Sequence, residues 1–285
     1  MNAAVHSPEF DSEFDDAGPF RAEAFAAPAE LPLFDPRRPK VRYRPLKAWH
    51  HFRRLVKNKE DTSEVFRIFE ALPWKGMPAA ARKFLGSGQG RAVMAVEPSL
   101  VDLLDDHAAL RRMPKGSLAH AYCDFMESEG LSAQGLVDEF DRFMADRPDY
   151  RDRFTLYLNR VRDTHDLLHV LTGYGRDALG EQCVLAFSYS QQPAPAHLLI
   201  AYAGAREIAK RAPQAPVYRA VREAQRLGKA CPRVAELSVR DWLPVQLEEA
   251  RAMLNITPPH YYRECHRIWR NEGIDPYQVL KPQAA

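Results

Sequence analysis

Two histidines and two carboxylates in the middle of the chain have a spacing that suits metal binding. His165 and His169 stand four positions apart, so on a helix their imidazoles project from one face, with Asp166 beside them. A glycine-containing stretch at 173–180 interrupts the helical pattern, and Glu181 follows early in a second helix. If the two helices fold back antiparallel, His169 lies about a turn before the bend and Glu181 about a turn after it. The four side chains would then converge.

Imidazole nitrogens and carboxylate oxygens are ligands for divalent metals. Zinc binds both at about 2.0–2.2 Å, and two histidines with carboxylates also surround non-haem iron, where positions stay open for substrate or oxygen. A lone pair of inward histidines is more often a hydrogen-bonded pair in a protein core. Two acids at the same depth favour a metal, because its charge would offset the cost of burying them. The predicted metal ligands are therefore His165, Asp166, His169 and Glu181.

The pattern H-D-x-x-H-x(11)-E that these residues form resembles the signature of the ubiquinone (coenzyme Q) biosynthesis protein 4 family. Residues 110–126, which contain Pro114-Lys-Gly-Ser117, resemble the leucine-proline-x-glycine-threonine/serine block of that family and the aromatic helix after it. Residues 242–256 resemble its closing acidic helix and its arginine-x-x-leucine-x-isoleucine tail. The similarity covers roughly residues 60–256.

The resemblance implies a role in ubiquinone biosynthesis. The implied reaction is metal-dependent (oxidative) decarboxylation and hydroxylation at carbon 1 of a polyprenylated hydroxybenzoate ring, a C1 decarboxylase (lyase) activity with the four ligands as catalytic residues. The metal that the resemblance implies is zinc, with iron as the other candidate. Arg176, in the loop beside Glu181, could pair with the substrate carboxylate or equally cap a helix end. A zinc protease is disfavoured, because Asp166 replaces the catalytic glutamate of a His-Glu-x-x-His motif.

A second hypothesis assigns the same residues to a different class of function. The chain could be a non-catalytic scaffold that binds a prenyl lipid, holds a structural metal and organises the ubiquinone biosynthetic complex. Under either hypothesis the expected partners are a polyprenylated benzoate or quinone-like lipid, the other ubiquinone-biosynthesis enzymes, a membrane surface and a second copy of the chain in a homodimer. Turnover of a prenylated hydroxybenzoate by the pure protein would separate the two.

The composition argues against several other classes of protein. With a formal charge of +2 and no recognisable nucleic-acid motif, the chain is not expected to bind nucleic acid. No apolar run reaches the roughly 18–20 residues that span a bilayer, and the acidic N-terminus does not resemble a signal or transit peptide. We therefore expect a protein of the bacterial cytoplasm, peripherally associated with the inner membrane. The four cysteines show no pairing or CxxC spacing, so we expect reduced thiols at Cys123, Cys183, Cys231 and Cys265.

Three segments of different composition follow one another along the chain. Residues 1–36 are rich in Ala, Pro, Asp and Glu, and we expect a disordered acidic tail whose scattered phenylalanines could alternatively form a docking motif. Residues 37–60 are a basic amphipathic segment, with a helix expected from about Leu46 to Asn58. That helix could lie on an anionic membrane or simply present a solvated basic face. Residues 61–285 are the predicted all-α ubiquinone-biosynthesis domain.

Beyond the basic segment the periodicity is helical, and no convincing strand pattern occurs. The expected fold is all-α: a single irregular bundle of about nine or ten helices around a central metal-binding helix pair. Within it we expect one long metal-bearing helix after Pro148, a flexible connection at residues 86–90, and solvated acids at 105–106. We also expect a helix over residues 244–254 with the proline in its first turn.

Two further segments leave alternatives open. An alanine-rich helix over residues 195–211 could pack closely against its neighbours or leave room for a long, thin apolar ligand. The last thirty residues carry His260, Tyr261, Tyr262 and Trp269, and we expect them to pack on the bundle or to form oligomer contacts.

Overall fold

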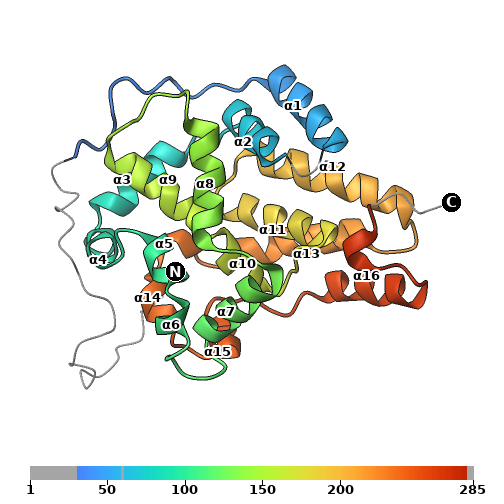
Figure 1. Cartoon of the computed structure of the whole chain (residues 1–285). Coiled ribbons are helices and arrows are strands. Elements are labelled where there is room, and N and C mark those ends of the chain that lie inside the picture. Colours follow the sequence, from blue (N-terminus) through green and yellow to red (C-terminus); the bar gives the residue numbers. More distant parts are fainter. Residues whose placement is uncertain (1–30, 59–60, 281–285) are drawn as a thin grey trace.

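The computed structural model describes residues 31–58 and 61–280 (Figure 1). The described residues contain no β-sheet, and the one isolated bridge joins Ser117 to Gln246. The all-α prediction is confirmed. Of the acidic tail predicted for residues 1–36, all but the last six residues lie outside the described part of the chain. Among the described helices, none combines the length and the apolar character needed to cross a bilayer.

The described helices are more numerous than the nine or ten expected, because several are only one or two turns long. In chain order they are α1 (Pro45–Lys57), α2 (Thr62–Ala71), α3 (Met77–Gly86), α4 (Gly88–Val96), α5 (Leu100–Asp105), α6 (His107–Leu110), α7 (Leu118–Glu129), α8 (Ala133–Met144), α9 (Arg153–Asp163), α10 (His165–Thr172), α11 (Ala178–Gln191), α12 (Pro195–Arg211), α13 (Val217–Ala230), α14 (Val239–Trp242), α15 (Leu247–Met253) and α16 (His260–Asn271).

Helix α11 lies at the centre of the molecule, covered by α12 and α13 (Figure 1). It is apolar nearly all round, with Cys183, Val184 and Phe187 fully buried, as expected of a helix that is packed on every side. Gly228 of α13 is needed for this packing, because a Cβ there would run into the backbone carbonyl of Phe187. The alanine-rich helix α12 also packs directly on α11, which agrees with the close-packing interpretation of residues 195–211.

Residues 31–38 bind the start of α9 and begin the described part of the chain. The N–H groups of Arg153 and Phe154 donate to the carbonyls of Pro32 and Leu33. Asp152 accepts from the guanidinium of Arg38 at 2.6 Å and from the backbone N–H of Asp35 at 2.7 Å. Burial would raise the pKa of the Asp152 carboxyl, but these donors and Thr155 outweigh burial and hold that pKa below its ordinary value. Part of the basic segment is therefore used inside the fold.

The prediction of a single long metal-bearing helix after Pro148 is wrong, because the structure has two helices there, α9 and α10. The boundary is Thr164, whose hydroxyl donates to the carbonyl of Val161 at 3.0 Å. A threonine hydroxyl that bonds a nearby carbonyl competes with the regular helical pattern. His165 consequently stands at the first position of α10.

The helix predicted over residues 244–254 begins later than expected, at Leu247. Residues 243–247 run alongside the start of α7 instead: Leu118 N–H donates to Val245, Ala119 N–H to Leu243, and Leu247 N–H to Gly116. These bonds hold the segment against α7, so Pro244 lies in the turn between α14 and α15 and not in the first turn of a helix.

Two smaller predictions are also wrong. The flexible connection expected at residues 86–90 is the start of α4, where the Ser87 hydroxyl accepts from Gly90 N–H at 2.9 Å and caps the helix. The acids at 105–106 are not merely solvated. Asp105 accepts from the backbone N–H groups of Ala133 and Gln134, and Asp106 caps α6.

Candidate metal centre

The predicted metal ligands lie on α10 and α11, and Arg176 lies on the loop between these helices. Helix α10 ends at Gly173, whose positive φ of 73° suits a residue without a side chain. Helix α11 begins after Asp177, whose carboxylate accepts from the N–H groups of Leu179 and Gly180. Glu181 therefore lies in the first turn of α11, as the sequence predicts.

His165, His169 and Glu181 form a compact group, with ligand atoms that all lie within 4.8 Å of one another. Oε2 of Glu181 is 3.8 Å from Nε2 of His165 and 3.6 Å from Nε2 of His169. The two imidazoles meet edge to face, with ring centroids 5.0 Å apart. The two helices thus present two nitrogens and one oxygen to a common point, as the fold-back prediction requires.

The group is closed on one side and open on the other. The side chain of His169 is fully buried, whereas those of His165 and Glu181 are about a third exposed, at 33% and 31%. An ion or a ligand atom could therefore reach the group from the side of His165 and Glu181, while His169 forms its floor.

The charges within the group reinforce one another. Burial would raise the pKa of the Glu181 carboxyl, but the two histidines outweigh burial and hold it well below its ordinary value. Burial would lower the pKa of His165, but the interaction of its ring N–H with the Glu181 carboxylate and the charges of Asp166 and Glu181 raise it. Glu181 is thus held as a carboxylate that faces both imidazoles, and a divalent cation bound here would compete with protons for the ring nitrogens.

His169 is held in the orientation that a metal ligand requires. Its Nδ1 lies 3.0 Å from the carbonyl of Tyr174, so a proton on Nδ1 makes this hydrogen bond and leaves Nε2 with a free lone pair. Nε2 is buried and has no hydrogen-bond partner among the described residues. Phe125 of α7 stacks on the ring, with centroids 5.4 Å apart. A buried, unpaired imidazole nitrogen that faces a carboxylate is the feature that a bound metal would explain.

Asp166 and Arg176 lie at the edge of the group. Asp166 is half-buried in the first turn of α10 and is not part of the compact group, although its charge acts on His165. Its role as a fourth ligand stays a prediction. Arg176 places Nε 3.5 Å from Oε1 of Glu181, whereas the two histidines approach Oε2, and its side chain is 39% exposed.

The C-terminal helix α16 supports the loop that orients His169. The Tyr262 hydroxyl donates to Asp177 at 2.5 Å and accepts from the N–H of Gly175 at 2.9 Å. His266 places Nε2 3.2 Å from the other oxygen of Asp177. Sequence reasoning treated this segment as packing or oligomer contact and missed the network, because contacts 85 or more positions apart leave no local pattern.

The site occurs in a region with clear relatives. A sequence model of the family described as Coenzyme Q (ubiquinone) biosynthesis protein Coq4 matches residues 57–260. The chain belongs to this family. The match contains all four predicted ligands and Arg176, and it ends just before Tyr262 and His266.

Individual Coq4 relatives cover the chain in part. The mitochondrial ubiquinone biosynthesis protein COQ4 homolog 2 of Culex quinquefasciatus is 31% identical over 108 residues, which is 38% of this chain and 45% of the relative. The human mitochondrial COQ4 homolog is 26% identical over 171 residues, which is 60% of this chain and 62% of the relative. The chain therefore matches less than two thirds of the length of either relative.

A solved structure shares the fold. The crystal structure of a Nostoc punctiforme protein assigned to ubiquinone biosynthesis superposes with a TM-score of 0.53 at 20% identity, covering 75% of this chain and 98% of that chain. At this identity the similarity concerns the fold alone, and the arrangement of the helices is the shared feature.

Proposed function

We propose that the chain acts in ubiquinone biosynthesis as a metal-dependent enzyme that exchanges the carboxylate at carbon 1 of a polyprenylated hydroxybenzoate for a hydroxyl. Membership of the Coq4 family supports the pathway. The observation that carries the chemistry is the convergence of His165, His169 and Glu181 about the unpaired Nε2 of His169.

The residues of the centre fit a divalent metal, zinc or iron. Two imidazole nitrogens and a carboxylate oxygen are a ligand set that catalytic metal sites use, with at least one position left for substrate. His165 and His169 would bind through Nε2 and Glu181 through Oε2, with Asp166 as the fourth candidate. Bound there, the metal would polarise the substrate carboxylate or phenolate as a Lewis acid.

The surrounding residues have distinct proposed roles. The Tyr174 carbonyl keeps the proton of His169 on Nδ1 and so fixes the ring that forms the floor of the centre. Within the described residues, the contact that holds Arg176 beside Glu181 is a long one of 3.5 Å, and its side chain is partly exposed, so its guanidinium can turn toward an entering carboxylate. Exchange of a carboxylate for a hydroxyl removes two electrons from the substrate, so an external oxidant such as dioxygen has to accept them.

Helix α1 is the proposed contact with the membrane that holds a prenylated substrate. Leu46 and Trp49 are 85% and 53% exposed, and Val56 is 41% exposed, although all three are apolar. Arg53 and Lys57 are exposed on the same helix, which carries no acid. Exposed apolar side chains among cations suit the interface of an anionic bilayer.

Metal content and turnover together test the proposed enzyme. The purified protein and its Glu181→Gln variant would be compared by elemental analysis and by release of labelled carbon dioxide from a short-chain prenylated hydroxybenzoate in air. Glu207→Gln, at a partly exposed glutamate of α12, is the matched control. We expect metal at this centre and carbon dioxide release from the parent and the control, and in Glu181→Gln the loss of one equivalent of metal and of carbon dioxide release. Bound metal without carbon dioxide release would favour the hypothesis of a non-catalytic scaffold. A protein that binds no metal would contradict both the enzyme hypothesis and the scaffold hypothesis.

A further inference from the structure

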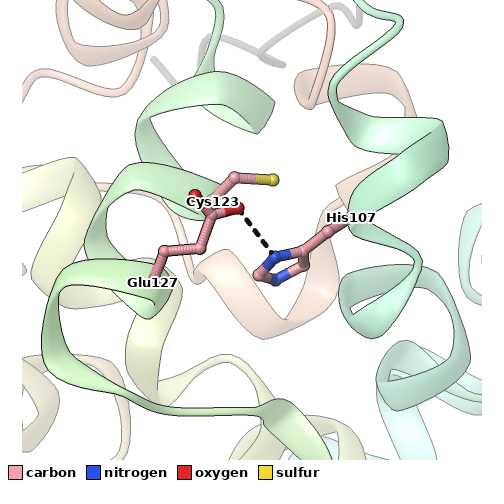
Figure 2. Close-up of side chains that lie close together, drawn as sticks. All are labelled: His107, Cys123 and Glu127. Carbon is pink, nitrogen blue, oxygen red and sulfur yellow. Dashed lines mark hydrogen bonds and ion pairs between the residues drawn. The ribbon is translucent and has the colours of Figure 1, made fainter.

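A second group of potential metal ligands lies between α6 and α7. Cys123 and Glu127 are four positions apart on α7, so both project from one face of that helix toward His107, the first residue of α6. Their ligand atoms lie within 4.8 Å of one another. Figure 2 shows the three side chains pointing toward a common point, with Nδ1 of His107 3.2 Å from Oε1 of Glu127.

The carboxylate of Glu127 is held in place by a neighbouring arginine. Arg111 donates from Nη2 to Oε2 of Glu127 and from Nη1 to Asp124, each at 2.6 Å. Oε2 is thus engaged, and Oε1 is the oxygen that faces His107. Metal-binding carboxylates commonly have their second oxygen fixed by such an outer hydrogen bond. The charge of Arg111 is matched by Asp124 and Glu127, so it does not leave the group with excess positive charge.

The thiol of Cys123 is the most buried of the three donors. Cys123 is fully buried and free, and no side-chain hydrogen bond engages its sulfur in the described part of the chain. The side chains of His107 and Glu127 are 27% and 52% exposed, so the group opens to solvent on their side. An ion could enter past Glu127 and reach the sulfur at the bottom of the group.

We propose that His107, Cys123 and Glu127 bind a thiophilic divalent metal of the zinc type, at a site separate from the His165–His169–Glu181 centre. Zinc accepts imidazole, thiolate and carboxylate ligands together, and three protein ligands leave the fourth tetrahedral position to water. The binding reaction transfers the thiol proton of Cys123 to solvent as the metal–sulfur bond forms.

The position of the site assigns it a structural role. A metal held by one ligand on α6 and two on α7 would join these helices, which the sequence connects only through the turn at residues 111–117. Helix α7 also carries Phe125, which stacks on His169. The second site would therefore fix the helix that forms one wall of the first centre, without providing it with a ligand.

Cobalt substitution distinguishes the two sites, because only one of them contains sulfur. The metal-free protein would be titrated with Co²⁺ while thiolate-to-cobalt charge-transfer absorption is recorded alongside bound cobalt. We expect two equivalents of cobalt and the charge-transfer absorption. Cys123→Ser should lose the absorption and one equivalent, whereas Glu181→Gln should keep the absorption. Cys231→Ser, which changes a buried cysteine outside either group, is the control and should behave like the parent.

A second variant, at an exposed residue, tests the same site even if Cys123→Ser does not fold. Glu127 is exposed, so Glu127→Gln should leave the fold intact and weaken cobalt binding at the sulfur-containing site by about 10-fold or more. Absence of the charge-transfer absorption from the folded parent protein would overturn the proposal and leave a His107–Glu127 ion pair beside a buried thiol. An unchanged affinity in Glu127→Gln would overturn the assigned ligand set.

Discussion

Replacing Tyr262 by phenylalanine should weaken metal binding at the His165–His169–Glu181 centre, although Tyr262 is not a ligand. Burial and the nearby Asp177 raise the pKa of Tyr262 above its ordinary value, so the hydroxyl keeps the proton that it donates to Asp177. Phenylalanine would remove that bond and also leave the N–H of Gly175 without its acceptor. These groups belong to the loop whose Tyr174 carbonyl orients His169.

The expected magnitude follows from the two lost bonds. A hydrogen bond to a charged group contributes about 1.5–3 kcal/mol and a neutral one about 0.5–1.5 kcal/mol, so Tyr262→Phe should lower the free energy of unfolding by about 2–4 kcal/mol. Loss of an outer-shell partner weakens metal binding by roughly 10–100-fold, and the effect here should be near the lower end because Tyr262 acts through the loop.

The assay needs both quantities from the same protein. Denaturant unfolding of the metal-free protein gives the stability, and competition with a chelator gives the metal dissociation constant. Tyr261→Phe is the matched control, since its hydroxyl takes no part in the Asp177 network. If Tyr262→Phe destabilised the fold but bound metal as tightly as the parent, Tyr262 would be a packing residue, and the positioning role would be refuted.

Three further predictions address other parts of the molecule. The pKa of Asp152 is lower in the folded than in the unfolded protein, so its contribution to stability is present above the unfolded pKa of about 4 and is lost as the pH falls below that value. Asp152→Asn should therefore destabilise the fold at pH 7. In denaturant titrations below pH 4, the difference in stability between this variant and the parent should shrink. The double variant Leu46→Glu/Trp49→Glu should weaken co-sedimentation with anionic vesicles at least about 10-fold without changing stability, and equal binding would exclude α1 as the membrane contact. Gly228→Ala should lower the free energy of unfolding by about 1–3 kcal/mol, and with it the melting temperature, because the added methyl meets the backbone of α11. An unchanged melting temperature would show that α11 and α13 can move apart without loss of stability.

The features that the sequence predicted well are those set by local periodicity. His165, His169 and Glu181 converge because their spacing around a glycine-containing bend fixes which faces meet, and neighbouring residues decide that geometry. The alanine-rich helix α12 was predicted with its observed bounds of Pro195–Arg211, since proline opens it and its apolar stripe is regular.

The errors occur where distant contacts override local preference. Pro244 would suit the first turn of a helix, but residues 243–247 pair with the start of α7, more than a hundred positions earlier. Glycines 86, 88 and 90 suggest a flexible connection, yet Ser87 caps a helix there and Gly90 is required because a Cβ would meet the Phe84 carbonyl. The sequence did not reveal the second ligand group either, because His107 and Cys123 are sixteen positions apart, which matches no familiar spacing of metal ligands.

The Asp177–Tyr262 contact also bears on the order in which the centre forms during folding. His169 and Glu181 are twelve positions apart, so the short α10–α11 hairpin can bring them together early and at little cost in chain entropy. Tyr262 reaches Asp177 across 85 positions, so that contact forms only once most of the chain has collapsed. A nascent hairpin would thus offer ligands that are loosely held, and tight coordination would arise as a late event. The rise in metal affinity during refolding would then report the time at which α16 docks.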